Sequence, residues 1–130
     1  QYSTAVRDAR LDVVESTIST SAILKIRSGS VPANCATADA GTVLATVNLP
    51  SDWMAAASSG TKSMSGTWQD TSADASGTAA HFRIYASDGT TCHIQGTVGT
   101  SGTDMIVDNT SFNAGQSFTV TAFTLTAGNA

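Results

Sequence analysis

Charged and reactive side chains are scarce in this sequence. Only 12% of its 130 residues are charged, and it has two histidines, two cysteines and two prolines. The six basic residues form no cluster and the formal net charge is −4, so the sequence lacks the basic patch that nucleic-acid binding requires. Apolar runs are far shorter than the roughly 20 residues of a membrane-spanning helix. We therefore expect neither nucleic acid nor a membrane as a partner.

Catalytic and metal-binding patterns are also missing. Cys35 and Cys92 are far apart in the sequence, whereas zinc sites use four ligands, usually in close pairs. No serine stands in a nucleophile-elbow pattern, and no pair of acids is singled out as a glycosidase pair would be. We expect no catalytic residue, no metal and no cofactor, and hence no enzyme. Two free thiols are the favoured interpretation of the cysteines, with a disulfide as the alternative.

What the sequence does contain is Ser, Thr, Ala and Gly in periodic patterns. Residues 3–18 predict the one helix, with Ser3 as its N-cap. Two apolar rows run along it, and charged residues fill the remaining side. The helix either packs on its own sheet or acts as an arm that docks on a neighbour. The first row is Val6, Ala9 and Val13, and the second is Leu11, Val14 and Ile18.

From residue 22 onward the period changes to two. Strands are predicted over residues 22–28, 42–49, 63–68, 104–108 and 117–126, with a bulge or two-sided burial near Ala122. Residues 30–41 and 69–78 are predicted surface loops. Residues 51–57 fit either a helical turn or a short strand.

The clearest local pattern is a hairpin over residues 81–98. A loop of residues 87–89 would place Gly89 at the left-handed position that such hairpins need. One side of the hairpin is then apolar, and we expect the other to be a solvated polar face. The apolar side pairs Phe82 with Ile94 and Ile84 with Cys92; the polar side pairs His81 with Gln95, Arg83 with His93 and Tyr85 with Thr91.

About seven short strands with turns every ten residues or so predict a mainly β fold. We expect an antiparallel β-sandwich or jelly-roll-like domain with one N-terminal α-helix. Residues 1–20 would be the helix or arm, and residues 21–130 the sandwich domain.

Some residues invite a functional interpretation. His81, Arg83 and His93 could form a metal or acid–base site, but a solvated polar face is favoured because no carboxylate of the hairpin supports either role. Asp70 and Asp74 fit turn chemistry better than calcium binding. Trp68 is expected to face inward. Trp53 is the better candidate for an exposed aromatic, and with Tyr85 it could stack on a sugar.

The last half of the chain resembles a recurring pattern in small virion proteins of tailed bacteriophages. The resemblance rests on residues 75–85, 87–90, 95–104 and 114–126, and more loosely on residues 23–27. Several such proteins act as capsid decoration, or cement, proteins. The resemblance implies a non-enzymatic protein on the capsid surface, assembled in the host cytoplasm.

The partners implied are the major capsid protein and further copies of the chain itself. A phage tail, connector or fibre protein is the first alternative, and a secreted carbohydrate-binding or adhesin-like module is the second. The residues expected to contact a partner lie on the helix and in exposed loops. They are Val6, Arg7, Arg10, Val14, Trp53, Asp70 and Asp74.

Overall fold

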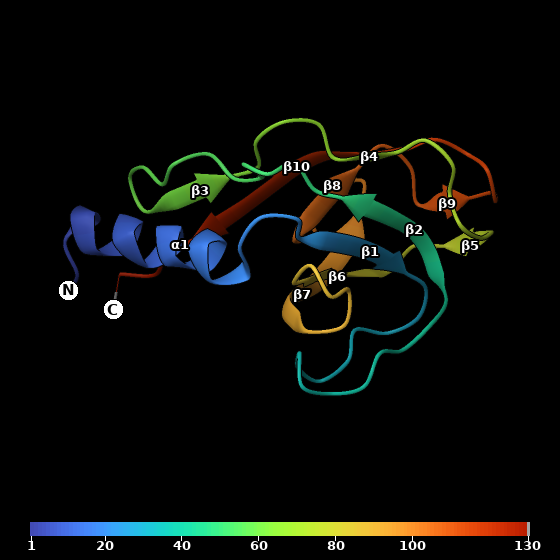
Figure 1. Ribbon diagram of the computed structural model, residues 1–130, viewed down its shortest axis with the longest axis horizontal. Coiled ribbons are helices and arrows are strands. Elements are labelled where there is room, and N and C mark those ends of the chain that lie inside the picture. Colours follow the sequence, from blue (N-terminus) through green and yellow to red (C-terminus); the bar gives the residue numbers. More distant parts are fainter. Residues whose placement is uncertain (130) are drawn as a thin grey trace.

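One N-terminal helix precedes a curled, mostly antiparallel sheet that forms a half-barrel in the computed structural model (Figure 1). The structure describes residues 1–129. The prediction of a mainly β fold with one helix is confirmed. The elements are α1 Thr4–Ile18, β1 Ile23–Arg27, β2 Val43–Asn48, β3 Thr61–Ser63, β4 Gln69–Asp70, β5 Gly77–Thr78, β6 His81–Tyr85, β7 Cys92–Gly99, β8 Met105–Val107, β9 Ser111–Phe112 and β10 Phe118–Thr126.

The main sheet has the strand order β2-β1-β6-β7-β8-β10-β3, and β4 pairs with the start of β10. Its pairs are antiparallel except for β7 and β8, which run parallel. Strands β5 and β9 form a separate two-stranded sheet. The predicted irregularity in the last strand is a bulge, because the pairing with β8 shifts between Val120 and Ala122.

Aromatic side chains fill the hollow of the curled sheet. Trp53 and Trp68 have ring centroids 6.0 Å apart, and Phe123 lies 5.5 Å from both Trp68 and Phe82. Trp68 faces inward as predicted. The expectation that Trp53 is exposed is wrong, because its side chain is fully buried and its indole N–H donates to the carbonyl of Ser19 at 3.2 Å. An indole satisfied at the end of α1 belongs to the core.

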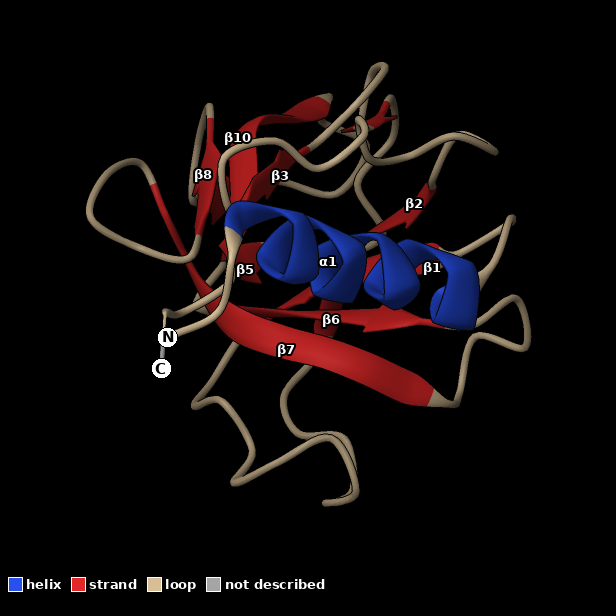
Figure 2. Ribbon diagram, turned by 90° about the vertical axis from the view of Figure 1, so that its left-hand side faces the viewer, coloured by secondary structure: helices blue, strands red, loops and turns tan. Residues whose placement is uncertain are grey.

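The helix begins as predicted. The side chain of Ser3 accepts a hydrogen bond from the Val6 amide, and the helix ends where Ser19 takes a positive φ of 71°. Figure 2 shows α1 lying across the open side of the curled sheet. Among residues 1–129, no helix is long and apolar enough to cross a bilayer.

The face by which α1 docks includes part of its charged side. Leu11 and Ile18 are buried, but the acidic side chains beside them also face the protein. Asp8, Asp12 and Glu15 accept hydrogen bonds from the backbone amides of Gly60, Ala57 and Met54. These amides need acceptors because they lie on the segment that borders β3.

Both edges of the main sheet are covered by the chain itself. The amides of Asp74 and Ala75 donate to the Leu44 carbonyl at the β2 edge. At the other edge, Ala55 donates to the Ser63 carbonyl and Met54 bridges to Met64. Residues 51–57 thus follow the strand-like alternative, and residues 69–78, predicted as a loop, contain β4 and β5. Covered edges leave little backbone free to pair with another chain.

The register of the 81–98 hairpin differs from the prediction. Observed pairs are Ile84 with Ile94, Arg83 with Gln95 and Tyr85 with Cys92, with a bulge between Ile84 and Tyr85. The loop has four residues, because Ala86 donates to the Thr91 carbonyl. The Asp88 carboxylate stabilises this longer loop by accepting the amides of Thr90 and Thr91, and Gly89 has the predicted left-handed φ, +68°.

The longer loop and the bulge together move the register by two residues. From His81 to Ile84 this shift of two returns each side chain to its predicted face. On the turn side of the bulge the shift is one, so Cys92, predicted on the apolar side, pairs with Tyr85 on the polar side. The pairs Phe82–Ile94, Ile84–Cys92, His81–Gln95, Arg83–His93 and Tyr85–Thr91 are therefore wrong.

Candidate functional site

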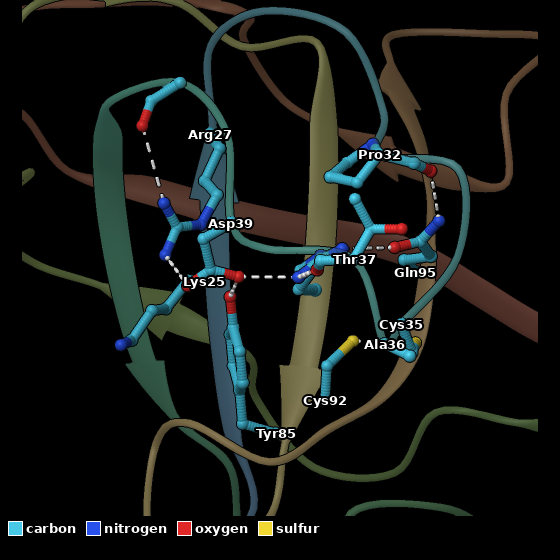
Figure 3. Close-up of polar contacts among 12 residues, drawn as sticks. Lys25, Arg27, Pro32, Cys35, Ala36, Thr37, Asp39, Tyr85, Cys92 and Gln95 are labelled. Carbon is cyan, nitrogen blue, oxygen red and sulfur yellow. Dashed lines mark hydrogen bonds and ion pairs between the residues drawn. The ribbon is translucent and has the colours of Figure 1, made fainter.

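The polar side of the hairpin lies beneath the loop of residues 28–42. This loop connects β1 to β2 and folds back over β1, β6 and β7 (Figures 1 and 3). Arg83 is 2% exposed, and His81 and Tyr85 are fully buried. The expected solvated face is thus a buried one, because the loop supplies most of the hydrogen-bond partners that water would otherwise supply.

One loop carboxylate, that of Asp39, binds three donors from two strands. Its Oδ2 accepts from Arg27 Nη2 at 2.7 Å, and its Oδ1 accepts from both Arg83 Nη1 and the Tyr85 hydroxyl at 2.7 Å (Figure 3). We call Arg27, Asp39, Arg83, Tyr85 and Gln95 the loop-anchoring cluster. This single negative charge forms ion pairs with both buried guanidinium groups, those of Arg27 and Arg83.

Carbonyl groups of the loop complete the cluster. Arg83 donates to the carbonyls of Thr37 and Asn34, both at 3.0 Å, and to Gln95 Oε1 at 2.8 Å. Gln95 in turn donates to the Pro32 carbonyl at 2.6 Å. The loop is therefore held by side chains of the sheet along most of its length.

Electrostatics keep the cluster in one protonation state at neutral pH. Burial works to raise the pKa of Asp39, but hydrogen bonds from Tyr85 and Arg83 and the two guanidinium charges outweigh it and hold this pKa below its usual value. Burial, together with the bond to Asp39, raises the pKa of Tyr85 to about 12. The carboxylate is charged and the phenol is neutral.

The two histidines do not come together. His81 Nδ1 lies 2.9 Å from the Gly29 carbonyl, which can only accept, so Nδ1 carries the proton. Burial lowers the pKa of His81 and keeps the ring neutral. His93 is exposed at the other end of the hairpin, beside α1. Among residues 1–129, no three His, Cys, Asp or Glu side chains are grouped as a metal site would require.

The two cysteines meet at the edge of the cluster. Cys35 in the loop and Cys92 at the start of β7 are free thiols, and their Sγ atoms lie 2.7 Å apart. Burial, together with the neighbouring thiol, raises the pKa of Cys92 to about 12.

The structure brings Asp70 and Asp74 together at the β2 edge. Asp70 accepts the Thr46 amide at 3.0 Å, and Asp74 accepts the Thr46 hydroxyl at 2.7 Å. The Asp70 carboxylate thus takes the place of a strand partner for the Thr46 amide, and Asp74 binds the side chain of the same residue. Asp74 remains exposed and Asp70 is half-buried.

The exposed apolar row of α1 is the main candidate for an interaction surface. Tyr2, Val6 and Val13 are 47%, 43% and 59% exposed, and Ala9 lies between them. We call these four residues the α1 outer face. Arg10 is exposed beside it, with its guanidinium 5.1 Å from the centre of the Tyr2 ring. A contiguous apolar row on a docked helix marks an interaction site more often than scattered apolar residues do.

The α1 outer face continues into a groove of about 240 Å³ between the helix and β7, lined by Val13, Val14, Thr17, Ile18 and His93. Among the predicted partner residues, Val6, Arg10 and Val14 therefore lie on or beside this surface. Arg7 does not, because it is half-buried and packs closely on the Gly60 backbone. Trp53 is in the core.

Sequence reasoning missed Asp39 and the covering loop. One signal was present: Arg27 and Arg83 both stand in strands rich in apolar residues, and a buried guanidinium requires a carboxylate partner. Comparison of the chain with family models, with curated proteins and with solved structures gives no match.

Proposed function

We propose that this protein is a non-enzymatic structural component of a tailed-phage virion, acting as a capsid decoration protein. In this proposal it binds the major capsid protein lattice as a homo-oligomer on the capsid surface. The single observation that carries the proposal is the α1 outer face, an apolar row left uncovered on a helix that is otherwise firmly docked. Exposing such a row to water is unfavourable, and burying it in a protein contact lowers the free energy.

Three further features support the proposal. The last half of the sequence resembles small virion proteins. Both sheet edges are covered by the chain itself, so an assembly contact would use side chains rather than added strands. A decoration protein makes many weak contacts on a repeating lattice, and multivalency supplies the strength that a small apolar row lacks. The sandwich or jelly-roll arrangement stays a prediction, and the proposal does not depend on it.

The alternatives are affected differently by the geometry. The carbohydrate-binding interpretation relied on Trp53 and Tyr85, and both side chains are fully buried, so neither can stack on a sugar. A tail, connector or fibre protein could use the same α1 outer face. Position in the particle separates that alternative from a decoration protein.

The test combines light scattering after size exclusion with co-sedimentation on undecorated capsids of the phage that encodes the chain. We expect the wild-type protein to form a defined oligomer and to sediment with capsids at fixed stoichiometry. Val13→Asp, which places a charge where the α1 outer face meets the groove, should weaken at least one of these associations roughly tenfold or more.

Thr100→Asp is the matched control, because it adds the same charge at an exposed position outside the α1 outer face. The proposal is rejected if the wild-type chain is a monomer that ignores capsids, or if labelled antibody finds the protein only in the tail. Equal weakening by both variants would reject the α1 outer face as the contact.

A further inference from the structure

The two thiols are held in place by well-defined structure on both sides. Asn34 Oδ1 accepts the amides of Ala36 and Thr37, a turn that fixes the backbone around Cys35. Arg83 binds the carbonyls of Asn34 and Thr37, one residue before and two residues after Cys35. Cys92 is fixed by its pairing with Tyr85 in the β6–β7 ladder.

The sulfur atoms face each other across this junction (Figure 3). Their 2.7 Å separation is within about 1 Å of the S–S bond length, about 2.05 Å, so a bond needs only a small side-chain movement. Both side chains are half-buried rather than sealed in the core, so a small reagent can reach them.

We propose that Cys35 and Cys92 form a reversible intramolecular disulfide that locks the loop of residues 28–42 onto β6 and β7. This site is independent of the proposed virion function. The oxidant we name is a low-molecular-weight disulfide such as oxidised glutathione.

The reaction is a two-step thiol–disulfide exchange. The Cys35 thiolate attacks one sulfur of oxidised glutathione, forming a mixed disulfide and releasing one glutathione thiolate. The Cys92 thiol then gives up its proton and attacks the Cys35 sulfur, and the second glutathione leaves. Two protein thiols are oxidised and one glutathione disulfide is reduced to two thiols. Cys92 acts second because its high pKa makes its thiolate scarce at neutral pH.

The bond would fasten the loop at a point that the ionic contacts do not reach. Asp39 ties the loop to Arg27 and Arg83, whereas Cys92 pairs with Tyr85 next to the hairpin turn, so both thiols lie apart from the Asp39 carboxylate (Figure 3). The two cysteines are 57 residues apart in the sequence, a separation at which a crosslink removes considerable entropy from the unfolded chain.

The experiment equilibrates the purified full chain with glutathione mixtures of increasing oxidised fraction, then traps free thiols by alkylation for mass spectrometry. We expect molecules with two alkylated cysteines to convert to molecules with none, without growth of a cross-linked dimer. Trypsin should then release residues 28–62 joined to residues 84–130. The oxidised protein should melt on the order of 10 °C above the reduced one.

Cys35→Ser and Cys92→Ser are the control variants, and in each the melting temperature should not respond to oxidised glutathione. Three results would overturn the proposal: two alkylated thiols at every ratio, one glutathione on each cysteine, or disulfide-linked dimers as the main product. If a serine variant fails to fold, the titration of the wild-type chain still decides among these outcomes.

Discussion

The carboxylate of Asp39 binds two guanidinium groups that the fold has taken almost entirely out of water. Its own position on a loop leaves it 38% exposed, so its side chain is the accessible part of an otherwise buried cluster. Removing one partner of a buried ion pair strongly destabilises the fold, because the other charge stays buried without compensation. The loop therefore depends on this one residue more than its surface position suggests.

Asp39→Asn should lower the free energy of unfolding by about 2 kcal/mol, somewhat less than for a fully buried pair because Asp39 is partly solvated. The amide keeps the size of the side chain but removes the negative charge that Arg27 and Arg83 share. Urea denaturation at pH 7 measures the loss. Asp52→Asn, at an exposed position, should change the value by less than about 0.5 kcal/mol. A similar small change for Asp39→Asn would contradict the role given to the cluster.

Single residues were predictable where a local rule decides them. The Ser3 cap and the left-handed Gly89 follow from short-range hydrogen bonding and backbone sterics. Trp53 and Arg83 were placed on the wrong side of the surface, because their burial depends on segments far away in the sequence. Trp53 packs against Trp68, and Arg83 lies under a loop that begins more than fifty residues before it.

At the scale of elements, α1 combines two unlike contacts. Leu11 and Ile18 bury apolar surface, while Lys62 on β3 is 3% exposed and bonds Asp12 at 2.8 Å and Glu15 at 2.9 Å. Its third donor goes to the Ala55 carbonyl. Burial works to lower the pKa of Lys62, but the bonds to Asp12 and Glu15 outweigh it and raise this pKa. The lysine is therefore charged at neutral pH.

Lys62→Met should loosen α1 rather than unfold the sheet. The variant leaves Asp12 and Glu15 without their shared cation, and an undocked helix of 15 residues is only marginally stable in water. We expect roughly tenfold faster tryptic cleavage at Arg7 and Arg10, since cleavage follows the population of the open form. Lys25→Met is the control: it removes a bond to the Gly89 carbonyl, away from the helix. Unchanged cleavage would mean that the apolar contacts alone hold α1.

Periodicity predicted the bounds of α1, β1, β2, β8 and β10, but the strand predicted over residues 63–68 is wrong, since it shares only Ser63 with β3. The docked face of α1 could not be predicted. Two apolar rows are present, and nothing local says which of them is covered. The amides of Met54, Ala57 and Gly60 favour the second row, because they bind the acidic side chains beside it. The first row is left outside.

For the whole molecule, strand order and curvature lie beyond what local patterns specify. The parallel pairing of β7 with β8 follows a short turn that a simple hairpin rule would have read as antiparallel. The covering of both edges likewise depends on long-range contacts. Composition and turn spacing set the class of fold, and tertiary packing sets the arrangement.

The free energy of unfolding should fall both at acidic and at alkaline pH. The lowered pKa values of His81, Asp39 and Asp104 mean that these groups stabilise the fold above their unfolded pKa values and that this contribution is lost as the pH falls. The decline starts below about pH 6.5 with His81 and steepens below about pH 4 with the aspartates. Tyr85 and, in the reduced protein, Cys92 have pKa values raised to about 12, so stability also falls as the pH rises above about 9.

Urea midpoints measured between pH 4 and pH 11 check this profile, with a maximum expected near pH 7 to 9. His81→Gln should flatten the part between pH 7 and pH 5, because the group that titrates there is gone. A wild-type protein whose midpoint stays constant from pH 7 to pH 5 would show that His81 binds protons equally well in the folded and unfolded chain.

The loop-anchoring cluster also restricts how this sequence can drift. Because a single acid serves both Arg27 and Arg83, a lineage that loses Asp39 keeps two unbalanced cations beneath the loop, and a lineage that loses one arginine keeps the reason to retain the acid. Substitutions at these three positions are therefore expected to depend on one another. Replacing this polar face by an apolar one requires changing all three residues, together with the loop that covers them.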